Sequence, residues 1–202
     1  MLAGMILSKK KRYQGSFLTI YSTSVQLPDG RRATCDVIEH PPAVVIVPVL
    51  PDGRLVLLRQ YRPVISEYLL ELPAGKLDPG EAPEAGAARE LEEETGYRAG
   101  TLRAITGFYP APGSMTEWMT LFVASDLRLA RAHRDEDELI ELKRMTLEQA
   151  LARADNGKIK DAKSLVGLLA YARSLASPRR LRATAPRPSR RAPRAASSAQ
   201  RR

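Results

Sequence analysis

The sequence predicts an α/β fold, in which strands and helices share one core around a mixed β-sheet. Two turn motifs, Pro28-Asp29-Gly30 and Pro51-Asp52-Gly53, separate runs that are rich in β-branched and aromatic residues, as is typical of strands. Residues 83–95 and 162–176 instead repeat apolar side chains at helical spacing. Because both kinds of run occur along one chain, we expect a sandwich of helices and sheet.

Strands are expected on both sides of the two turns. Residues 16–27 and 31–39 flank the first turn and predict a β-hairpin. Residues 43–50 form a near-continuous apolar run, which is typical of a strand buried on both faces, and 55–59 return after the second turn. Two further strands are expected, at 101–108 and 118–125.

Helix boundaries carry their own signals. Pro83 suits the first turn of a helix, and Gly96 suits its left-handed stop. Thr146-Leu-Glu-Gln149 has the form of a capping box and predicts a short helix to about residue 154. The last helix, 162–176, is expected to turn five side chains inward: Leu165, Leu168, Leu169, Ala172 and Leu175.

Composition narrows the class of protein. The 202 residues carry a net charge of +9, but nine arginines and no acid follow Ser177, so the remaining 23 basic residues balance the 23 acidic ones. The basic pI is therefore no sign that the fold binds nucleic acid. Residues 177–202 hold almost no large apolar side chains, which predicts a disordered tail.

The single cysteine, Cys35, excludes an intrachain disulfide and a zinc cluster built on cysteines. This usage favours a reducing, cytoplasmic setting. No apolar run reaches the length of about 18 residues that a transmembrane helix needs, so no membrane association is expected.

The helix at 83–95 places three carboxylates, Glu90, Glu93 and Glu94, on one face. Such crowded carboxylates need a counter-charge to stay ionised, and hard divalent ions such as Mg²⁺ supply it. Arg89 lies four residues before Glu93 and could pair with it. A solvated acidic helix face would also explain the glutamates, but it does not explain the Gly-x5-Glu pattern upstream.

That upstream pattern extends the helix motif into a known signature. Residues 75–97 resemble the Nudix box of hydrolases that act on nucleoside diphosphates linked to another group. Every fixed position is present, and only Tyr97 departs, standing where an aliphatic residue is usual. The resemblance implies a Nudix-type α/β/α sandwich. The box residues are Gly75, Glu81, Arg89, Glu90, Glu93, Glu94 and Gly96.

Further segments resemble the ADP-ribose pyrophosphatase branch of this family: 59–63 and 71–75 before the box, 109–117 after it, and 157–164 at the start of the last helix. The resemblance covers roughly residues 12–176. It implies an N-terminal strand and hairpin dimerisation segment at 1–40 and a Nudix hydrolase domain at 41–176. The tail at 177–202, expected from composition, has no counterpart in the family.

The resemblance also implies the metal ligands. Two or three Mg²⁺ ions, with Mn²⁺ as an alternative, would be held by Glu90, Glu94 and Glu93 and by the backbone carbonyl of Ala74. Glu93 would in addition take part in catalysis. Glu81 would support these ligands from behind.

By the same resemblance, substrate contacts are expected from Arg62, Arg59, Glu71 and Glu117. Arg62 would reach the phosphates or ribose of the substrate, although a surface salt bridge is an equally weighted alternative. Glu71 could bind substrate or pair with Arg59, and the sequence does not separate the two. One departure concerns residues 35–36, where relatives often carry Arg-Glu and this chain has Cys35-Asp36.

The general base is expected in the acidic run 135–138. By resemblance, a loop glutamate here prepares the attacking water, with Glu136 as the base and Glu138 as its helper. A shift of one residue would exchange the two, and an exposed acidic loop without a catalytic role is the alternative.

The expected reaction is metal-dependent hydrolysis of ADP-ribose to AMP and ribose 5-phosphate. GDP-mannose or another nucleotide sugar is the main alternative substrate. A protein that binds nucleic acid or processes RNA ends through the arginine tail is disfavoured, because the tail offers no aromatic side chain for base stacking. The intact glutamates argue against a binding module without catalysis.

The resemblance to the ADP-ribose pyrophosphatase branch also implies a homodimer, in which the hairpin at 16–39 reaches across to the partner's site. Two strands alone are marginally stable in water, so the hairpin must pack on something. The alternative is that it extends the sheet of its own domain.

Overall fold

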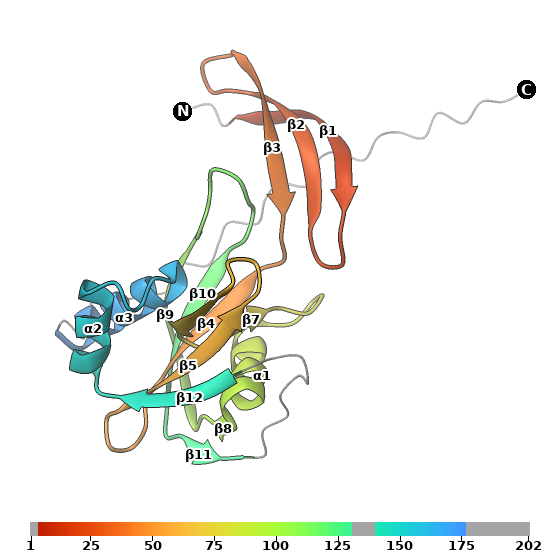
Figure 1. Cartoon of the computed structure of the whole chain (residues 1–202). Helices are drawn as coiled ribbons and strands as arrows, with labels where there is room; N and C mark the ends of the chain where they lie inside the picture. The colour runs from red at the N-terminus through yellow and green to blue at the C-terminus, as the bar shows by residue number, and fades with distance from the viewer. Residues whose placement is uncertain (1–3, 131–139, 177–202) are drawn as a thin grey trace, which may run out of the picture.

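The computed structural model describes residues 4–130 and 140–176 (Figure 1). Its N-terminal part is a three-stranded antiparallel sheet in the order β1 (Met5–Gln14), β2 (Thr19–Gln26), β3 (Arg32–Glu39). The predicted hairpin is therefore correct for β2 and β3. No residue range was predicted for β1, which adds a third strand on the free edge of β2. Figure 1 shows this sheet standing away from the rest of the molecule.

The body is built on a mixed central sheet with the strand order β7 (Ala74–Lys76), β4 (Ala43–Pro48), β10 (Met119–Ser125), β9 (Thr101–Phe108). Strands β4 and β10 pair in parallel, whereas their outer neighbours are antiparallel. Every residue of β4 is buried, as its apolar run predicts.

Two smaller sheets complete the body. One has the order β12 (Ile140–Met145), β5 (Leu55–Arg62), β6 (Glu67–Glu71), and the other pairs β8 (Tyr97–Arg98) with β11 (Arg128–Leu129). The sequence had predicted only part of β5 among these strands. The turn between β4 and β5 is confirmed, since Gly53 adopts a φ of 81° that favours glycine.

Helices cover both faces of the central sheet, which confirms the α/β/α sandwich (Figure 1). Helix α1 (Pro83–Thr95) lies on one face, and α2 (Leu147–Asp155) and α3 (Ala162–Ala176) lie on the other. Gly96 ends α1 with a φ of 71°, and its N–H bonds to the carbonyl of Glu92. The capping box of α2 is also present, because Thr146 and Gln149 bond to each other's backbone.

The core consists of two clusters, one on each face of the sheet. Residues of β4 alternate between them: Val45 and Val47 pack toward α2 and α3, whereas Val44 and Ile46 pack toward α1. Since β4 supplies both clusters, it fixes α1 relative to α3 across the sheet.

The inward face of α3 differs from the prediction. Leu169 and Leu175 are more than half exposed, at 54% and 57%. Small residues face the core in their place: Ser164, Gly167 and Ser174, beside Leu168 and Tyr171. The reason is steric, because a Cβ on Gly167 would lie 2.4 Å from Cδ1 of Leu72, so the backbone of α3 approaches the sheet closely.

The N-terminal sheet meets the body through the end of β3. The N–H of Ile38 donates to the carbonyl of Ser114 at 2.8 Å, and the N–H of Thr116 donates back to Ile38 at 3.0 Å. The segment that follows β9 is thereby fixed next to the N-terminal sheet. Cys35, on β3, is exposed.

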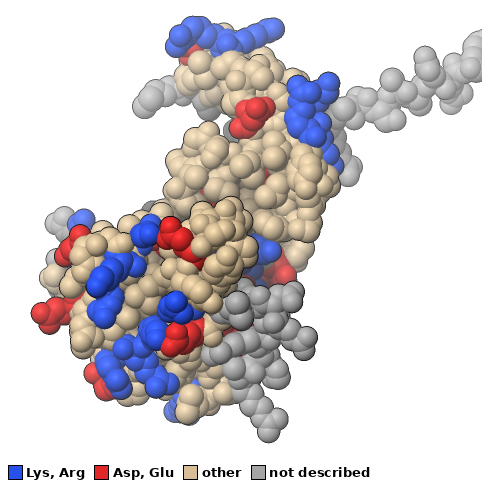
Figure 2. Space-filling model, viewed as in Figure 1, with Lys and Arg blue, Asp and Glu red and all other residues tan. Residues whose placement is uncertain are grey.

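Charge is spread differently over the two parts. Figure 2 shows acidic and basic side chains interspersed on the visible face of the body, and basic side chains gathered at the outer sides of the N-terminal sheet. Strand β1 contributes the run Lys9-Lys10-Lys11-Arg12, all exposed. None of the helices in the described ranges is long and apolar enough to cross a membrane.

Candidate active site

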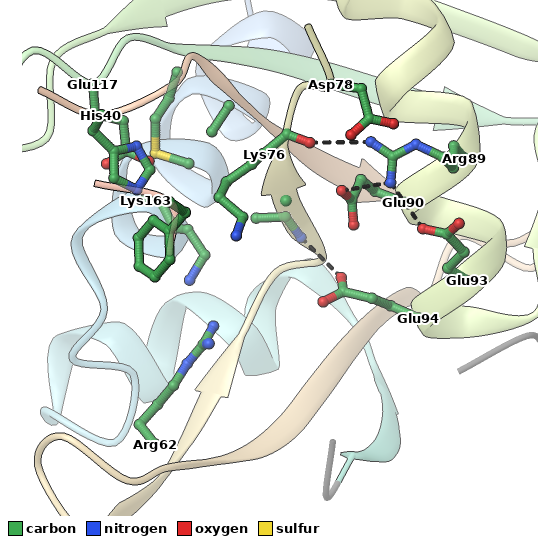
Figure 3. A pocket seen from close by; sticks show the side chains of 15 residues that line it. His40, Arg62, Lys76, Asp78, Arg89, Glu90, Glu93, Glu94, Glu117 and Lys163 are labelled. Carbon is green, nitrogen blue, oxygen red and sulfur yellow. Dashed lines mark hydrogen bonds and ion pairs between the residues drawn. The ribbon is translucent and has the colours of Figure 1, made fainter. Parts of the chain in front are cut away.

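A cavity of about 520 Å³ opens between α1, the start of α3 and the junction of the N-terminal sheet with the body. Figure 3 shows glutamates of α1 on one side and His40, Glu117 and Lys163 on the other, with Arg62 below. The cavity is lined by Phe17, His40, Ala43, Arg62, Ala74, Gly75, Lys76, Asp78, Arg89, Glu90, Glu93, Glu94, Glu117, Met119 and Lys163.

Arg89 organises the acidic side of the cavity. Its guanidinium donates to Glu81 at 2.9 and 3.0 Å, to Glu90 at 2.8 Å and to Glu93 at 2.9 Å. It also donates to the carbonyl of Lys76 at 3.0 Å, which ties α1 to the end of β7. The hydrogen bonds with Glu81, followed by those with Glu90 and Glu93, raise the pKa of Arg89. The predicted Arg89–Glu93 pair is thus one part of a larger cluster.

Glu94 faces the strand instead. The N–H of Ala74 donates to Oε2 of Glu94 at 2.9 Å, and the Glu94 residue is only 7% exposed. Ala74 is held in register by β4, where it pairs with Val45. This bond brings the Glu94 carboxylate beside the backbone of β7, where the carbonyl of Ala74 is expected to serve as a ligand.

The donor set of this side fits a hard divalent cation, because carboxylate and carbonyl oxygens are what such ions prefer. Gly75 lets the Glu90 carboxylate lie against the strand, because a Cβ at residue 75 would lie 2.0 Å from that carboxylate. Within the described ranges, no three histidine, cysteine or acidic side chains converge on one point, and Glu90 and Glu93 turn to Arg89.

The opposite side of the cavity is cationic. Arg62 donates to both oxygens of Glu71, at 2.8 and 2.6 Å, and Lys163 donates to the same carboxylate. The Glu71 residue is 1% exposed. Burial alone would raise the pKa of Glu71, but the hydrogen bonds and charges of Arg62 and Lys163 outweigh this effect and lower it. The bond with Glu71 raises the pKa of Arg62 in turn.

The start of α3 fixes Lys163. Asp161 accepts hydrogen bonds from Lys163 at 2.9 Å, from the Ser164 N–H at 3.0 Å and from its hydroxyl at 2.6 Å. The Ser164 hydroxyl oxygen accepts from the N–H of Leu72 at 2.7 Å. The first turn of α3 is therefore bonded to the residue that follows Glu71.

The far end of the cavity joins the N-terminal sheet to the body. Nδ1 of His40 lies 3.4 Å from Oε1 of Glu117, and burial raises the pKa of Glu117 although the nearby His40 lowers it. Phe17, in the turn between β1 and β2, stands edge-on to the His40 ring at 5.5 Å. The ammonium of Lys76 lies 4.2 Å from the centre of the Phe17 ring.

The structure brings most of the sequence-predicted residues to this cavity: Arg62, Ala74, Gly75, Arg89, Glu90, Glu93, Glu94 and Glu117. Glu81 lies behind Arg89, and Glu71 lies behind Arg62. Arg59 is not among the lining residues; its guanidinium stacks on Tyr68 at 3.9 Å and lies 3.7 Å from Glu141. Glu136 and Glu138 fall outside the described residues.

Sequence reasoning missed Lys163, Lys76, Phe17 and the role of His40 in the lining. Lys163 had a usable signal, because it lies within the segment 157–164 that resembles relatives. Lys76 and Phe17 had none, since their proximity depends on how the N-terminal sheet meets the body.

Comparison with known proteins agrees with this arrangement. A family model described as the NUDIX domain matches residues 39–165. An ADP-ribose pyrophosphatase of Bacillus subtilis (strain 168) is 38% identical over 160 residues, which are 78% of this chain and 86% of that protein. A GDP-mannose pyrophosphatase of Citrobacter koseri is 41% identical over 129 residues, 59% of this chain and 66% of that protein.

A solved structure has the same fold over nearly its whole length. The crystal structure of an ADP compounds hydrolase superposes with a TM-score of 0.78 at 27% identity, covering 90% of this chain and 98% of the other. The family model spans more than half of the chain and includes the acidic helix, its preceding strand and Lys163. The chain therefore belongs to the Nudix family and is a Nudix hydrolase.

Proposed function

We propose that this enzyme hydrolyses the diphosphate bond of a nucleoside diphosphate sugar, with ADP-ribose converted to AMP and ribose 5-phosphate. The observation that carries the proposal is that one cavity is lined by the glutamates of α1 on one side and by Arg62 and Lys163 across from them (Figure 3). A diphosphate needs both, because its charge must be neutralised while water attacks it. The names of the relatives, an ADP-ribose pyrophosphatase and an ADP compounds hydrolase, favour an ADP sugar.

Hydrolases of the Nudix family generally use divalent metal ions, and we assign Mg²⁺ here, with Mn²⁺ as an alternative. Glu90, Glu93 and Glu94, with the carbonyl of Ala74, would hold two or three ions. When bound, such ions neutralise the diphosphate and lower the pKa of water. Arg89 orients Glu90 and Glu93 through its ion pairs, and Glu81 in turn orients Arg89.

The remaining steps belong to side chains of this chain. Arg62 and Lys163 bind the phosphate oxygens that face away from the glutamates. Glu117, held near His40, accepts hydrogen bonds from a substrate hydroxyl. Glu136 removes the proton of the attacking water and Glu138 assists, as general base catalysis requires a carboxylate within reach of that water.

A substrate panel tests the reaction. ADP-ribose, GDP-mannose, other nucleotide sugars, dinucleoside polyphosphates and capped RNA are incubated with Mg²⁺ or Mn²⁺, and products are separated by chromatography. We expect AMP and ribose 5-phosphate from ADP-ribose, with no turnover in EDTA. Absence of turnover on every nucleotide sugar would overturn the proposal.

GDP-mannose is the second candidate, favoured by the similarity to the GDP-mannose pyrophosphatase of Citrobacter koseri. The two reactions share the metal side and the cationic side and differ only in the base and sugar. The ratio of kcat/KM for ADP-ribose and GDP-mannose in the same panel decides between them.

We further propose a homodimer formed through residues 1–40, with residues 41–176 as the hydrolase domain and 177–202 as the tail. The N-terminal sheet does not join the central sheet in the described residues. Its outer strand exposes Met5, Ile6 and Tyr13 by 56–60%, and Phe17 is 49% exposed. Such apolar area is usual where a second copy packs.

Light scattering of the active enzyme at micromolar concentration tests the dimer. Removal of residues 1–39 should then abolish dimerisation and substrate binding together. A fully active monomer would contradict this part of the proposal.

We also place the enzyme in the cytoplasm, which the single cysteine favours.

A further inference from the structure

The most buried charge at the cavity belongs to Glu71, which the reaction as described does not use. The Glu71 residue is 1% exposed and receives three hydrogen bonds, two from Arg62 and one from Lys163. A buried carboxylate is costly unless it is fully paired, so this arrangement needs both cations in place.

The two cations come from distant parts of the chain. Arg62 ends β5 and Lys163 opens α3, and both line the cavity, whereas Glu71 does not. Figure 3 shows the charged ends of Arg62 and Lys163 on the side of the cavity opposite Glu93 and Glu94. One carboxylate therefore brings together two cations that would otherwise repel each other.

The hydrogen bonds to Glu71 and Asp161 limit how many N–H donors Arg62 and Lys163 can present to a ligand. Arg62 uses Nε and one terminal nitrogen on Glu71, which leaves the N–H groups of its other terminal nitrogen for a ligand. Lys163 uses two of its three donors, on Glu71 and Asp161. The pair thus presents fixed donors to an anion, and prior ordering of such side chains lowers the entropy lost on binding.

We infer that Glu71 is a positioning residue, which holds Arg62 and Lys163 as one preformed clamp for the phosphate of the substrate that lies away from the acidic side. This inference rests on the proposed function and adds to it separate roles: Arg62 and Lys163 bind the phosphate, and Glu71 positions them. Glu71 touches no substrate and acts through the two cations. Its effect falls on substrate binding, because the clamp is formed before the bond is broken.

The test compares Glu71→Gln with Glu67→Gln in the full chain. Glu67 lies on the same strand and pairs with Lys160 at 2.7 Å, outside the cavity, so it is a matched control. The glutamine in Glu71→Gln keeps the shape of the side chain and loses its charge. We expect KM for ADP-ribose to rise roughly tenfold or more while kcat changes less than about threefold. Glu67→Gln should leave both values near those of the wild type.

Binding is measured separately from turnover. Calorimetry with a non-hydrolysable methylene analogue of ADP-ribose, in EDTA, should show the same loss of affinity for Glu71→Gln. Added to Arg62→Ala, the Glu71→Gln change should weaken binding less than it does in the wild type, because only Lys163 is then left for Glu71 to position. Glu71→Asp, which restores the charge, should recover part of the affinity.

Three results would overturn the inference: an unchanged KM, a loss confined to kcat, or fully additive effects of Glu71→Gln and Arg62→Ala. If Glu71→Gln does not fold, Lys163→Met is measured, since it removes one cation and leaves the Arg62–Glu71 pair. An unchanged KM in Lys163→Met would also overturn the clamp. A wild type without activity on any nucleotide sugar would instead overturn the proposed function.

Discussion

Gly75 and Glu90 stand so close that no side chain fits between them. A Cβ on residue 75 would lie 2.0 Å from the Glu90 carboxylate, far inside any real contact. The strand that leads into α1 and the helix itself are thereby locked at one separation. The position of Glu90 relative to the carbonyl of Ala74 depends on this contact.

Gly75→Ala should therefore displace Glu90 and lower activity by roughly 10- to 100-fold, the usual cost of disturbing the support of a metal ligand. Metal titration of activity should shift to higher Mg²⁺ concentrations. Circular dichroism should show that the protein is still folded. A Gly75→Ala enzyme with normal Mg²⁺ dependence would show that Glu90 needs no such placement.

Glu94→Gln should lower kcat by orders of magnitude, because it removes a charged oxygen ligand while keeping the shape of the side chain. Glu92→Gln is the matched control on the same helix, where Glu92 pairs with Arg98 at 2.6 Å and does not line the cavity. Steady-state kinetics of the two variants checks the assignment. Similar activities in both would remove Glu94 from the metal ligands.

Arg89→Met should destabilise the protein at neutral pH. The hydrogen bonds from Arg89 lower the pKa of Glu81 below its ordinary value of 4.5. A lowered pKa gives stability that is fully present above pH 4.5 and is lost as the pH falls through the lowered value. Melting temperatures of the wild type and Arg89→Met should thus converge on acidification. A constant difference across this range would contradict the ion-pair explanation.

Glu117→Gln should raise the melting temperature at pH 7 above that of the wild type. Burial raises the pKa of Glu117 above 4.5, so its ionised form costs stability as the pH rises through the raised value. Below the ordinary pKa the gain should disappear, because Glu117 is then protonated in both states. The same variant should bind substrate more weakly.

Glu39→Gln is the control for that experiment, since Glu39 is 49% exposed on its side chain and pairs with Lys9 at the surface. Its melting temperature should match that of the wild type. If Glu117→Gln is less stable than the wild type at pH 7, Glu117 must be held by partners that favour its charge.

The assignment of the general base is tested by Glu136→Gln and Glu138→Gln. If Glu136 takes the proton of the attacking water, its loss should lower kcat much more than it weakens binding of substrate or metal. The effect of Glu138→Gln should be smaller. The reverse order would show that the assignment is shifted within the acidic run.

The sequence predicted best those parts in which a local rule decides the structure. Helix α1 begins at Pro83 and stops at Gly96 as expected, since both signals act on the backbone next to them. The acidic helix face was visible for the same reason. The range of strand β1 was not predicted. All its residues are exposed, so its sequence shows no alternation of apolar and polar residues.

The cationic side of the cavity could not be predicted from local patterns. Lys163 and Glu71 are 92 positions apart in the sequence but form a hydrogen bond. This contact depends on how closely α3 approaches the sheet. The approach is set by Gly167 against Leu72, which a hydrophobic pattern cannot show. For the same reason, the prediction that Leu169 and Leu175 of α3 face the core was wrong.

Because the proposed clamp includes Lys163 of α3, it is completed late in the synthesis of the chain. Ribosomes make the chain from its N-terminus, so the glutamates of α1 emerge long before Lys163, the last cavity residue in the sequence. A nascent chain that ends before residue 163 therefore contains all the glutamates of α1 but only one of the two cations that bond to Glu71.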